Sequence, residues 1–322
     1  DNAGEFDTKV VVINVTDVNE PPEVSDATFT VDENSPNGTI VSTVTATDPE
    51  MDNLTYTITA GAIDVFDIGS TSGQITVQDS ALLNFEALSG TPHFTLTVQV
   101  SDSVLTDTAE IGINVNNVNE VPTVDNATFA IDENSAAGTA VGTVAANDPE
   151  GPVTFAIING NTGFTFAINA STGQITVASS TPLNYEVTPT FNLTVQVTDN
   201  GLPAPIDFKT NTASITINLN NKNEAPTVNN ATFTIPQDSP NGAVVGTVSA
   251  SDPDTVDTLT FSIIGGNTGS AFAINATTGR ITVNDSTKLD ADTMPTYSLT
   301  VQVLDKGNLP DTATISINVT AL

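Results

Sequence analysis

The sequence repeats itself at intervals of about 100 residues, and this periodicity constrains the fold more than any other feature. The block ATFTVDENSPNG at residue 27 returns as ATFAIDENSAAG at 127 and as ATFTIPQDSPNG at 231. A second block, FDIGSTSGQITV at 66, has counterparts at 166 and 272. Self-similarity with a fixed period marks tandem structural units. The sequence therefore predicts three homologous domains in a row.

Each repeat carries the pattern of short β-strands. In FTLTVQV, the apolar residues Phe94, Leu96 and Val98 alternate with polar ones, which is typical of a strand with one buried face. Turn-forming stretches such as NSPNG and DPE separate the apolar runs. The strands predicted in the first repeat are 27–31, 39–46, 54–59, 66–68, 74–78, 94–101 and 108–115. Seven short strands in about 100 residues predict an all-β domain, a Greek-key sandwich of the immunoglobulin-like type.

The repeats place the predicted domain boundaries at 19–118, 119–222 and 223–322. Residues 1–18 match only the end of a repeat, because FDTKVVVINVTDVNE parallels LTDTAEIGINVNNVNE at 105–120. The third repeat already has a closing strand of its own, TATISINV. We therefore expect residues 1–18 to be the closing strand of a truncated upstream repeat, in the same or another chain. Donation of this strand to a different molecule stays open as the alternative.

The charge balance narrows the classes of partner. There are 38 Asp and Glu against 6 Lys and Arg, and residues 10–208 contain no Lys or Arg at all. Nucleic acids and anionic membrane surfaces need basic clusters, so neither is an expected partner. No apolar run approaches the roughly 18 residues that span a bilayer, so membrane insertion is not expected. The acidic surplus either maintains solubility or forms oxygen-rich cation sites.

Five motifs recur in a fixed order. They are DENS, the run ATDPE with its variants, FAINASTGQI, LNFE or LNYE, and the linker phrase NVNEVP with its copies DVNEPP and NKNEAP. Together they resemble the motifs of cadherin repeats over the whole chain, including the cadherin-like repeats of large bacterial surface proteins. The absence of cysteine also suits many bacterial surface proteins. The resemblance implies tandem sandwiches in an elongated rod, with the linker phrase at the centre of a calcium site between successive domains.

The resemblance also implies a set of ligands for up to three Ca²⁺ ions at each joint. At the first complete joint they are Glu33, Glu86, Asn117, Asn119, Glu120, Asp148, Glu150 and Asp199, with Asn84 nearby. At the second they are Glu133, Glu186, Asn221, Asn223, Glu224, Asp252, Asp254 and Asp305, with Asn184 nearby. The first linker contributes Asp17, Asn19, Glu20, Asp48, Glu50 and Asp102. The residue types fit this chemistry, because Ca²⁺ takes six to eight carboxylate and carbonyl oxygens. Six carboxylates at a complete joint would balance three divalent ions.

Several positions depart from the family pattern in ways that are expected to weaken binding. Asn stands in place of Asp at 84, 117, 184 and 221, and Glu replaces the second Asp of the linker. The run DPEGPVTF lacks the Asn that follows the paired acids in the family, so the ion site farthest into the second repeat is expected to be the weakest. In the third repeat, Gln237 and Asp292 stand where the earlier repeats have glutamates, so that end is expected to bind calcium poorly.

These observations favour a calcium-binding, calcium-rigidified rod or spacer of an extracellular cell-surface adhesin or matrix protein. Two alternatives stay open: a direct adhesion module that binds its own kind or a carbohydrate, and a metal-independent array of sandwiches or filament subunit. Other surface proteins or polysaccharide are possible partners. The chain contains no Trp, so strand exchange anchored by Trp, as in classical cadherins, is not open to it. No enzyme activity is predicted, because the paired acids recur at every domain end without a nucleophile–base signature. Any single Asp or Asn here is more simply a turn residue, and only the whole set points to a metal.

Overall fold

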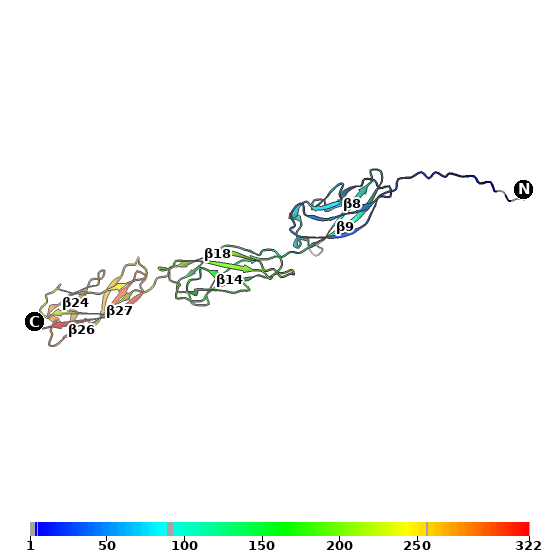
Figure 1. Cartoon of the computed structure of the whole chain (residues 1–322). Coiled ribbons are helices and arrows are strands. Elements are labelled where there is room, and N and C mark those ends of the chain that lie inside the picture. The colour runs from blue at the N-terminus through cyan, green and yellow to red at the C-terminus, as the bar shows by residue number, and fades with distance from the viewer. Residues whose placement is uncertain (1–3, 5, 89–92, 256, 322) are drawn as a thin grey trace. The chain divides into compact units, whose positions relative to one another are not determined.

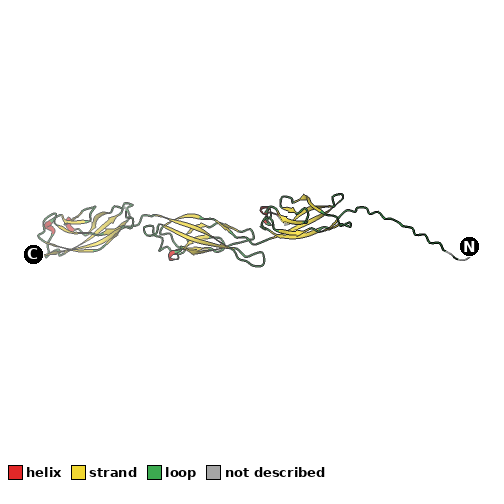
Figure 2. Cartoon of the chain, turned by 45° about the horizontal axis from the view of Figure 1, so that its top comes forward, coloured by secondary structure: helices red, strands yellow, loops and turns green. Residues whose placement is uncertain are grey.

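A computed structural model of the chain describes residues 4, 6–88, 93–255 and 257–321 (Figure 1). These described residues form strands joined by loops, with five short 3-10 turns and no α-helix (Figure 2). They fall into two compact units. The first unit comprises 1–124, 146–154 and 197–211, and the second comprises 125–145, 155–196 and 212–322.

The first repeat contains nine strand segments. They are β1 (Glu23–Val24), β2 (Ala27–Asp32), β3 (Ile40–Thr43), β4 (Ala46–Thr47), β5 (Thr55–Gly61), β6 (Phe66–Ile68), β7 (Gln74–Val77), β8 (His93–Ser101) and β9 (Thr106–Asn116). One sheet has the order β2-β9-β8-β5, another has the order β3-β7-β6, and β1 pairs with β4. The chain leaves β5 for the second sheet and returns to β8, which lies between β5 and β9. This return is the Greek-key connection that the strand pattern predicts.

Every strand predicted in this repeat has a counterpart, with one difference at 39–46. The structure divides this run into β3, which pairs with β7, and β4, which pairs with β1. A register shift between Ile40 and Ser42 marks a bulge in β3. The sequence pattern could not show the division, because the apolar alternation continues while the strand changes its partner from one sheet to the other.

The core of the first repeat confirms the predicted inward-facing residues. Leu96, Val98 and Val100 of β8 are fully buried, as are Ile111 and Ile113 of β9. Successive residues of a strand point to opposite faces, so this alternation fixes which face of the sheet packs inward. An aromatic pair adds to the core: the rings of Phe66 and Phe94 meet edge to face, with centroids 5.4 Å apart.

The second and third repeats follow the same plan. The second contains β10 (Thr123–Val124), β11 (Ala127–Asp132), β12 (Ala140–Thr143), β13 (Ala146–Asn147), β14 (Thr154–Asn159), β15 (Phe166–Ile168), β16 (Gln174–Val177), β17 (Thr190–Thr198) and β18 (Thr210–Asn220). The third contains β19 (Thr227–Val228), β20 (Ala231–Pro236), β21 (Val244–Thr247), β22 (Ala250–Ser251), β23 (Thr260–Gly265), β24 (Phe272–Ile274), β25 (Arg280–Val283), β26 (Thr296–Leu304) and β27 (Pro310–Thr320). Their large sheets have the orders β11-β18-β17-β14 and β20-β27-β26-β23, which repeat the order of the first. The prediction of tandem seven-stranded sandwiches is confirmed.

The opening segment differs from the repeats. No residue in 6–22 belongs to a strand. Its apolar side chains are exposed, including Val10 at 87%, Ile13 at 81% and Val15 at 90%. An alternating apolar segment of this kind needs a neighbouring strand before it can form a ladder.

Candidate metal centre

The pairing of β2 with β9 places Glu33 at the first joint. The two strands run parallel, and Asp32 at the end of β2 lies opposite Asn116 at the end of β9. Glu33 comes next, so its carboxylate lies beside the start of the linker. Its Oε1 accepts from the N–H of Val118 at 2.8 Å, and its Oε2 accepts from the N–H of Phe85 at 2.8 Å. The parallel pairing of β2 with β9 thus places Glu33, which is only 2% exposed, beside the linker.

Three glutamates meet at this point. Oxygens of Glu33, Glu86 and Glu120 lie within 4.8 Å of one another. The side-chain amide of Asn117 donates from Nδ2 to Glu86 Oε1 at 3.1 Å, which leaves its own Oδ1 free to face the cluster. Acids from two different loops and the linker therefore converge on one small volume.

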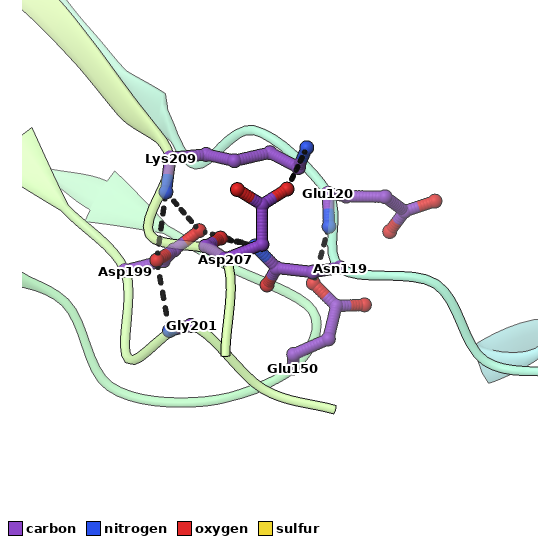
Figure 3. Close-up of polar contacts among 7 residues, drawn as sticks. All are labelled: Asn119, Glu120, Glu150, Asp199, Gly201, Asp207 and Lys209. Atoms are coloured by element: carbon purple, nitrogen blue, oxygen red, sulfur yellow. Dashed lines mark hydrogen bonds and ion pairs between the residues drawn. The ribbon is translucent and has the colours of Figure 1, made fainter. Parts of the chain in front are cut away.

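The second half of the linker contacts the loops of the following repeat (Figure 3). Asn119 Nδ2 donates to Asp199 Oδ2 at 2.8 Å and to the backbone oxygen of Asp207 at 2.6 Å. The N–H of Glu120 donates to Glu150 Oε2 at 3.2 Å (Figure 3). These bonds join the linker phrase to three acidic residues of the following repeat.

Several oxygens at this joint are buried and have no hydrogen-bond partner among the residues that the structure describes. Asp148 is 8% exposed, and neither of its carboxylate oxygens is paired. The other such oxygens here are Glu86 Oε2, Asn117 Oδ1, Asn119 Oδ1 and Glu150 Oε1. Buried polar atoms are normally satisfied, and an unpaired buried anion is costly. Oxygens of this kind are suitable ligands for a hard cation.

The two lysines that form ion pairs in the described part of the chain do not pair with these acids. Lys209 Nζ pairs with Asp207 at 2.9 Å (Figure 3), and Lys222 Nζ pairs with Asp132 at 2.8 Å. Neither of those acids is a predicted ligand. Lys209 offers Asp199 only its backbone N–H, at 3.0 Å to each carboxylate oxygen. Asp199 also accepts from Asn119 Nδ2 and from the N–H of Gly201.

The pKa values reflect this crowding. Burial, followed by the neighbouring carboxylate of Asp148, raises the pKa of Glu150 to about 8. Burial also raises the pKa of Glu33, and the charges of Glu86 and Glu120 act in the same direction. Desolvation and like charge both disfavour the ionised carboxylate. Both effects favour the protonated forms of Glu150 and Glu33.

The second joint repeats this geometry within the second unit. Glu133 is 2% exposed and accepts from the N–H groups of Lys222 and Tyr185, each at 2.7 Å. Asn221 Nδ2 donates to Glu186 Oε1 at 2.9 Å. Each of these contacts has its counterpart 100 to 104 residues earlier, so the repeat of the sequence motifs is also a repeat of side-chain geometry.

The far side of the second joint is equally acidic. Asn223 Nδ2 donates to Asp305 Oδ2 at 2.7 Å, and the N–H of Glu224 donates to Asp254 Oδ2 at 3.0 Å. Oδ2 of Asp252 and Oε2 of Glu224 are buried and unpaired among the described residues. Burial is the first cause that raises the pKa values of Glu186, Glu224 and Asp252.

The first linker forms the downstream half of such a site. Asn19 Nδ2 donates to Asp102 Oδ2 at 2.8 Å, and the N–H of Glu20 donates to Glu50 Oε2 at 3.3 Å. The N–H of Glu50 in turn donates to Asp48 Oδ1 at 3.0 Å. Oxygens of three acids lie within 4.8 Å of one another: Asp17, Glu20 and Glu50. The six predicted residues of this linker are thus placed together.

Two further predicted ligands, Asn84 and Asn184, form hydrogen bonds within their own turns. Asn84 Oδ1 accepts from the N–H of Ala87 at 2.7 Å, and Asn184 Oδ1 accepts from the N–H of Val187 at 2.8 Å. Both side chains therefore stabilise the turns that carry Glu86 and Glu186, which is a common role for Asn. At the corresponding end of the third repeat, Gln237 Oε1 accepts from the N–H of Ala291 at 3.1 Å, and Asp292 is exposed.

The structure adds to the second joint an acid, Asp257, that the sequence motifs did not indicate. Asp257 has a buried Oδ2 without a partner among the described residues, and its charge helps to raise the pKa of Asp252. Its N–H donates to the backbone oxygen of Asp254 at 2.9 Å, which turns the loop back toward the joint. The signal was present as the third acid of DPDTVD, but its distance from the motif gave no reason to include it.

The donor set at each joint fits a hard divalent cation. Every predicted ligand offers oxygen, from carboxylates or side-chain amides, and none offers nitrogen or sulfur. Ca²⁺ accepts irregular shells of six to eight oxygens, whereas Mg²⁺ demands a near-octahedral shell. Crowded glutamates, aspartates and asparagines on loops suit Ca²⁺ better.

Comparison with known proteins agrees with the fold and with the linker motifs. The family profile described as Cadherin domain matches residues 27–116, 127–220 and 231–321. Human protocadherin Fat 1 is 30% identical over 99% of the chain, and rat cadherin-23 is 33% identical over 80% of it. The chain spans only 7% and 8% of the lengths of these relatives. Both are animal proteins, so the comparison with bacterial surface proteins finds no support in them.

The solved structures agree at the level of fold. A crystal structure of mouse cadherin-23 EC22-24 superposes with a TM-score of 0.69, covering 95% of this chain and all of that one, at 23% identity. Within the described part of the chain, no helix is both long and apolar enough to cross a bilayer.

Proposed function

The chain belongs to the cadherin family, and from this premise we propose that it is a calcium-rigidified spacer segment of an adhesion protein. Its repeats are ectodomain repeats of the kind found in extracellular adhesion proteins, and its location is extracellular. Members of this family are adhesion proteins rather than enzymes, and we propose no catalytic role. The finer comparison, with bacterial surface repeats, rests on the sequence alone.

One observation carries the calcium proposal. At the first joint, Asp148 is buried with both oxygens unpaired among the described residues, and five further carboxylates belong to the same joint. Ca²⁺ would supply the positive charge and the coordination that these oxygens lack. Glu33, Glu86 and Glu120 would bind it from the first repeat and the linker, and Asp148, Glu150 and Asp199 from the second repeat. The second joint offers the corresponding set.

The proposed mechanism is electrostatic. Without cations, the acids of a joint repel one another, so the linker is free to flex. With cations, acids from both repeats bind the same ions and the joint closes. Extracellular calcium modules bind with dissociation constants of about 10⁻⁴ to 10⁻³ M. At ten times that concentration each ion contributes roughly 1.4 kcal/mol. Three ions would stabilise a joint by about 4 kcal/mol on the same basis.

Small-angle scattering and thermal melting, in calcium and in EDTA at matched ionic strength, test this proposal. We expect a larger maximum dimension and a higher melting temperature in calcium, because bound ions stiffen the joints. Magnesium at the same concentration serves as the control for simple charge screening and should act more weakly. Identical scattering and melting curves in calcium and EDTA would favour the metal-independent array instead.

The raised pKa values predict how calcium binding depends on pH. The pKa of Glu150 is raised to about 8, so in the ion-free state this group keeps its proton above its ordinary value of 4.5. Its contribution to stability is complete below pH 4.5 and is lost as the pH rises through about 8. In EDTA the melting temperature should therefore fall between pH 5 and pH 8.

Over the same pH range, the calcium affinity should change in the direction opposite to the melting temperature in EDTA. Affinity should increase from pH 5 to pH 8, and protons should be released on binding. Calorimetry in two buffers of different ionisation enthalpy measures the number of protons. Groups with a lowered pKa, such as Asp102, lose their contribution to stability only below pH 3.8, which is outside the pH range of this experiment. A pH-independent affinity with no proton release would contradict the proposed role of Glu150.

We also propose the domain boundaries 19–118, 119–222 and 223–322. The regular spacing of the joints supports them. Residues 1–18 are proposed as a closing strand that needs a neighbouring repeat, because their alternating apolar side chains are exposed. For the protein as a whole, the proposed partner class is another cadherin chain; this segment has no Trp of its own to anchor an exchanged strand.

A further inference from the structure

An asparagine follows the buried glutamate at the end of the first strand in two repeats. Asn34 and Asn134 both have positive φ angles, of 57° and 56°. Their N–H groups donate to the backbone oxygens of Leu83 and Leu183, each at 2.9 Å, which holds the two residues in this conformation. Asn is one of the few residues that adopt a left-handed conformation without a large penalty. The backbone therefore has a local reason to carry Asn, or Gly, here.

The side chains of these two residues donate a hydrogen bond that Gly could not donate. Asn34 Nδ2 donates to Glu120 Oε1 at 2.5 Å, and Asn134 Nδ2 donates to Glu224 Oε1 at 2.7 Å. Both acceptors are the glutamate of the linker phrase. The contact occurs at both complete joints, between residues 86 and 90 positions apart.

We propose that Asn34 and Asn134 are positioning residues, which hold the linker glutamate with one carboxylate oxygen on the amide and the other directed into the cation cluster. This inference rests on the proposed calcium function. At the second joint the division is visible directly: Oε1 of Glu224 is bound by Asn134, while its Oε2 is buried and unpaired among the described residues. At the first joint, Glu120 is held within 4.8 Å of Glu33 and Glu86, which repel it when no ion is present.

The chemistry of the amide explains why this residue suits the task. A glutamate side chain has several rotatable bonds, and like charges nearby would drive it toward solvent in the ion-free state. A neutral N–H donor restrains the carboxylate without adding a positive charge. A lysine or arginine at the same place would instead neutralise the acid and compete with the metal ion.

The third repeat provides an internal comparison. Its sequence at this position is PQDS instead of DENS, so Gln237 and Asp238 replace the glutamate and the asparagine. Asp238 is not among the described residues with positive φ, and its ionised side chain cannot donate a hydrogen bond. The amide is thus found where the buried glutamate is found, and both are replaced together.

The test uses the full chain and follows two backbone N–H signals by NMR during calcium titration. Val118 N–H donates to Glu33 and reports on the first joint, whereas Lys222 N–H donates to Glu133 and reports on the second. Asn34→Gly keeps the left-handed backbone and removes only the amide. We expect it to raise the calcium midpoint at Val118 by about three- to tenfold and to leave Lys222 unchanged. Asn134→Gly should do the reverse.

A double-mutant comparison separates positioning from a simple turn role. In a Glu120→Ala background, Asn34→Gly should have no further effect on the midpoint at Val118, because the group that it positions is gone. Asn37→Ala is the structural control: Asn37 Oδ1 accepts from the N–H of Ser80 at 2.7 Å, so this variant should lower the melting temperature but not the calcium affinity.

Two results would overturn the inference. If Asn34→Gly leaves the midpoint at Val118 unchanged, or weakens binding equally with and without Glu120, Asn34 is only a turn residue, while the wild-type titration still supports the calcium function. If the wild-type chain shows no calcium-dependent change at Val118 or Lys222, the proposed function itself fails, and this inference fails with it.

Discussion

Replacing Glu120 with alanine is expected to weaken calcium binding at the first joint at least about tenfold, or roughly 1.4 kcal/mol. Glu120 lies in the linker, its oxygen is within 4.8 Å of oxygens of Glu33 and Glu86, and its N–H donates to Glu150. The substitution would leave five carboxylates to bind three divalent ions and would remove the one that lies between ligands of both repeats. Calcium titration of the full chain, followed at the Val118 N–H, measures the change.

Glu110→Ala is the matched control for charge. Glu110 is an exposed glutamate on β9; its backbone N–H donates to Asp26, and its carboxylate takes part in no hydrogen bond or ion pair among the described residues. Removing it changes the net charge of the chain by the same amount without touching the joint. The second joint, observed at Lys222, should respond to neither variant. Equal affinities for the two variants would mean that the linker phrase is only a turn, and the calcium proposal would then be untenable.

Replacing Glu33 with alanine is expected to destabilise the first repeat by about 3 kcal/mol even in EDTA. Its carboxylate accepts two backbone hydrogen bonds, from Val118 and Phe85, and the residue is 2% exposed. Without it, two buried N–H groups lose their acceptor and a cavity opens. For a domain of this size that loss corresponds to a fall in melting temperature of roughly 12 °C or more.

Glu33→Gln separates this structural role from the proposed metal role. Burial raises the pKa of Glu33, so the charge is disfavoured in the ion-free protein. In EDTA a neutral amide should therefore cost less than alanine, although its NH₂ group cannot accept the hydrogen bond that Glu33 Oε1 takes from Val118. The third repeat shows that a glutamine can fill this position, where Gln237 accepts from the N–H of Ala291. In calcium, however, Glu33→Gln should lose most of the stabilisation at the first joint. The melting temperatures of both variants, with and without calcium, separate the two roles. Equal melting temperatures of the alanine and glutamine variants in EDTA would argue against the hydrogen-bonding role of Glu33.

The sequence by itself determined the architecture of this protein. The alternation in FTLTVQV predicted which residues of β8 face the core, because the side-chain period of a strand is a local property. The repeated motifs predicted three like domains, and their residue types predicted oxygen-rich sites at the linkers. The first two inferences are confirmed, because each depends on patterns that lie within the chain's own sequence, and the third stays a prediction. The ligand assignments themselves remain predictions for the titrations above.

The tertiary structure alone decided which side chains meet. Glu33 reaches Val118, 85 residues away, only because β2 and β9 pair in parallel with Asp32 opposite Asn116. The same register brings Asn34 to Glu120, a contact that no motif indicated. The loop conformations likewise let Asn84 accept a hydrogen bond within its own turn and bring Asp257 close enough to Asp252 to raise the pKa of Asp252. The physical reason is that strand register and loop path are set by packing between segments distant in sequence, so chemistry that depends on their meeting cannot be read from local patterns.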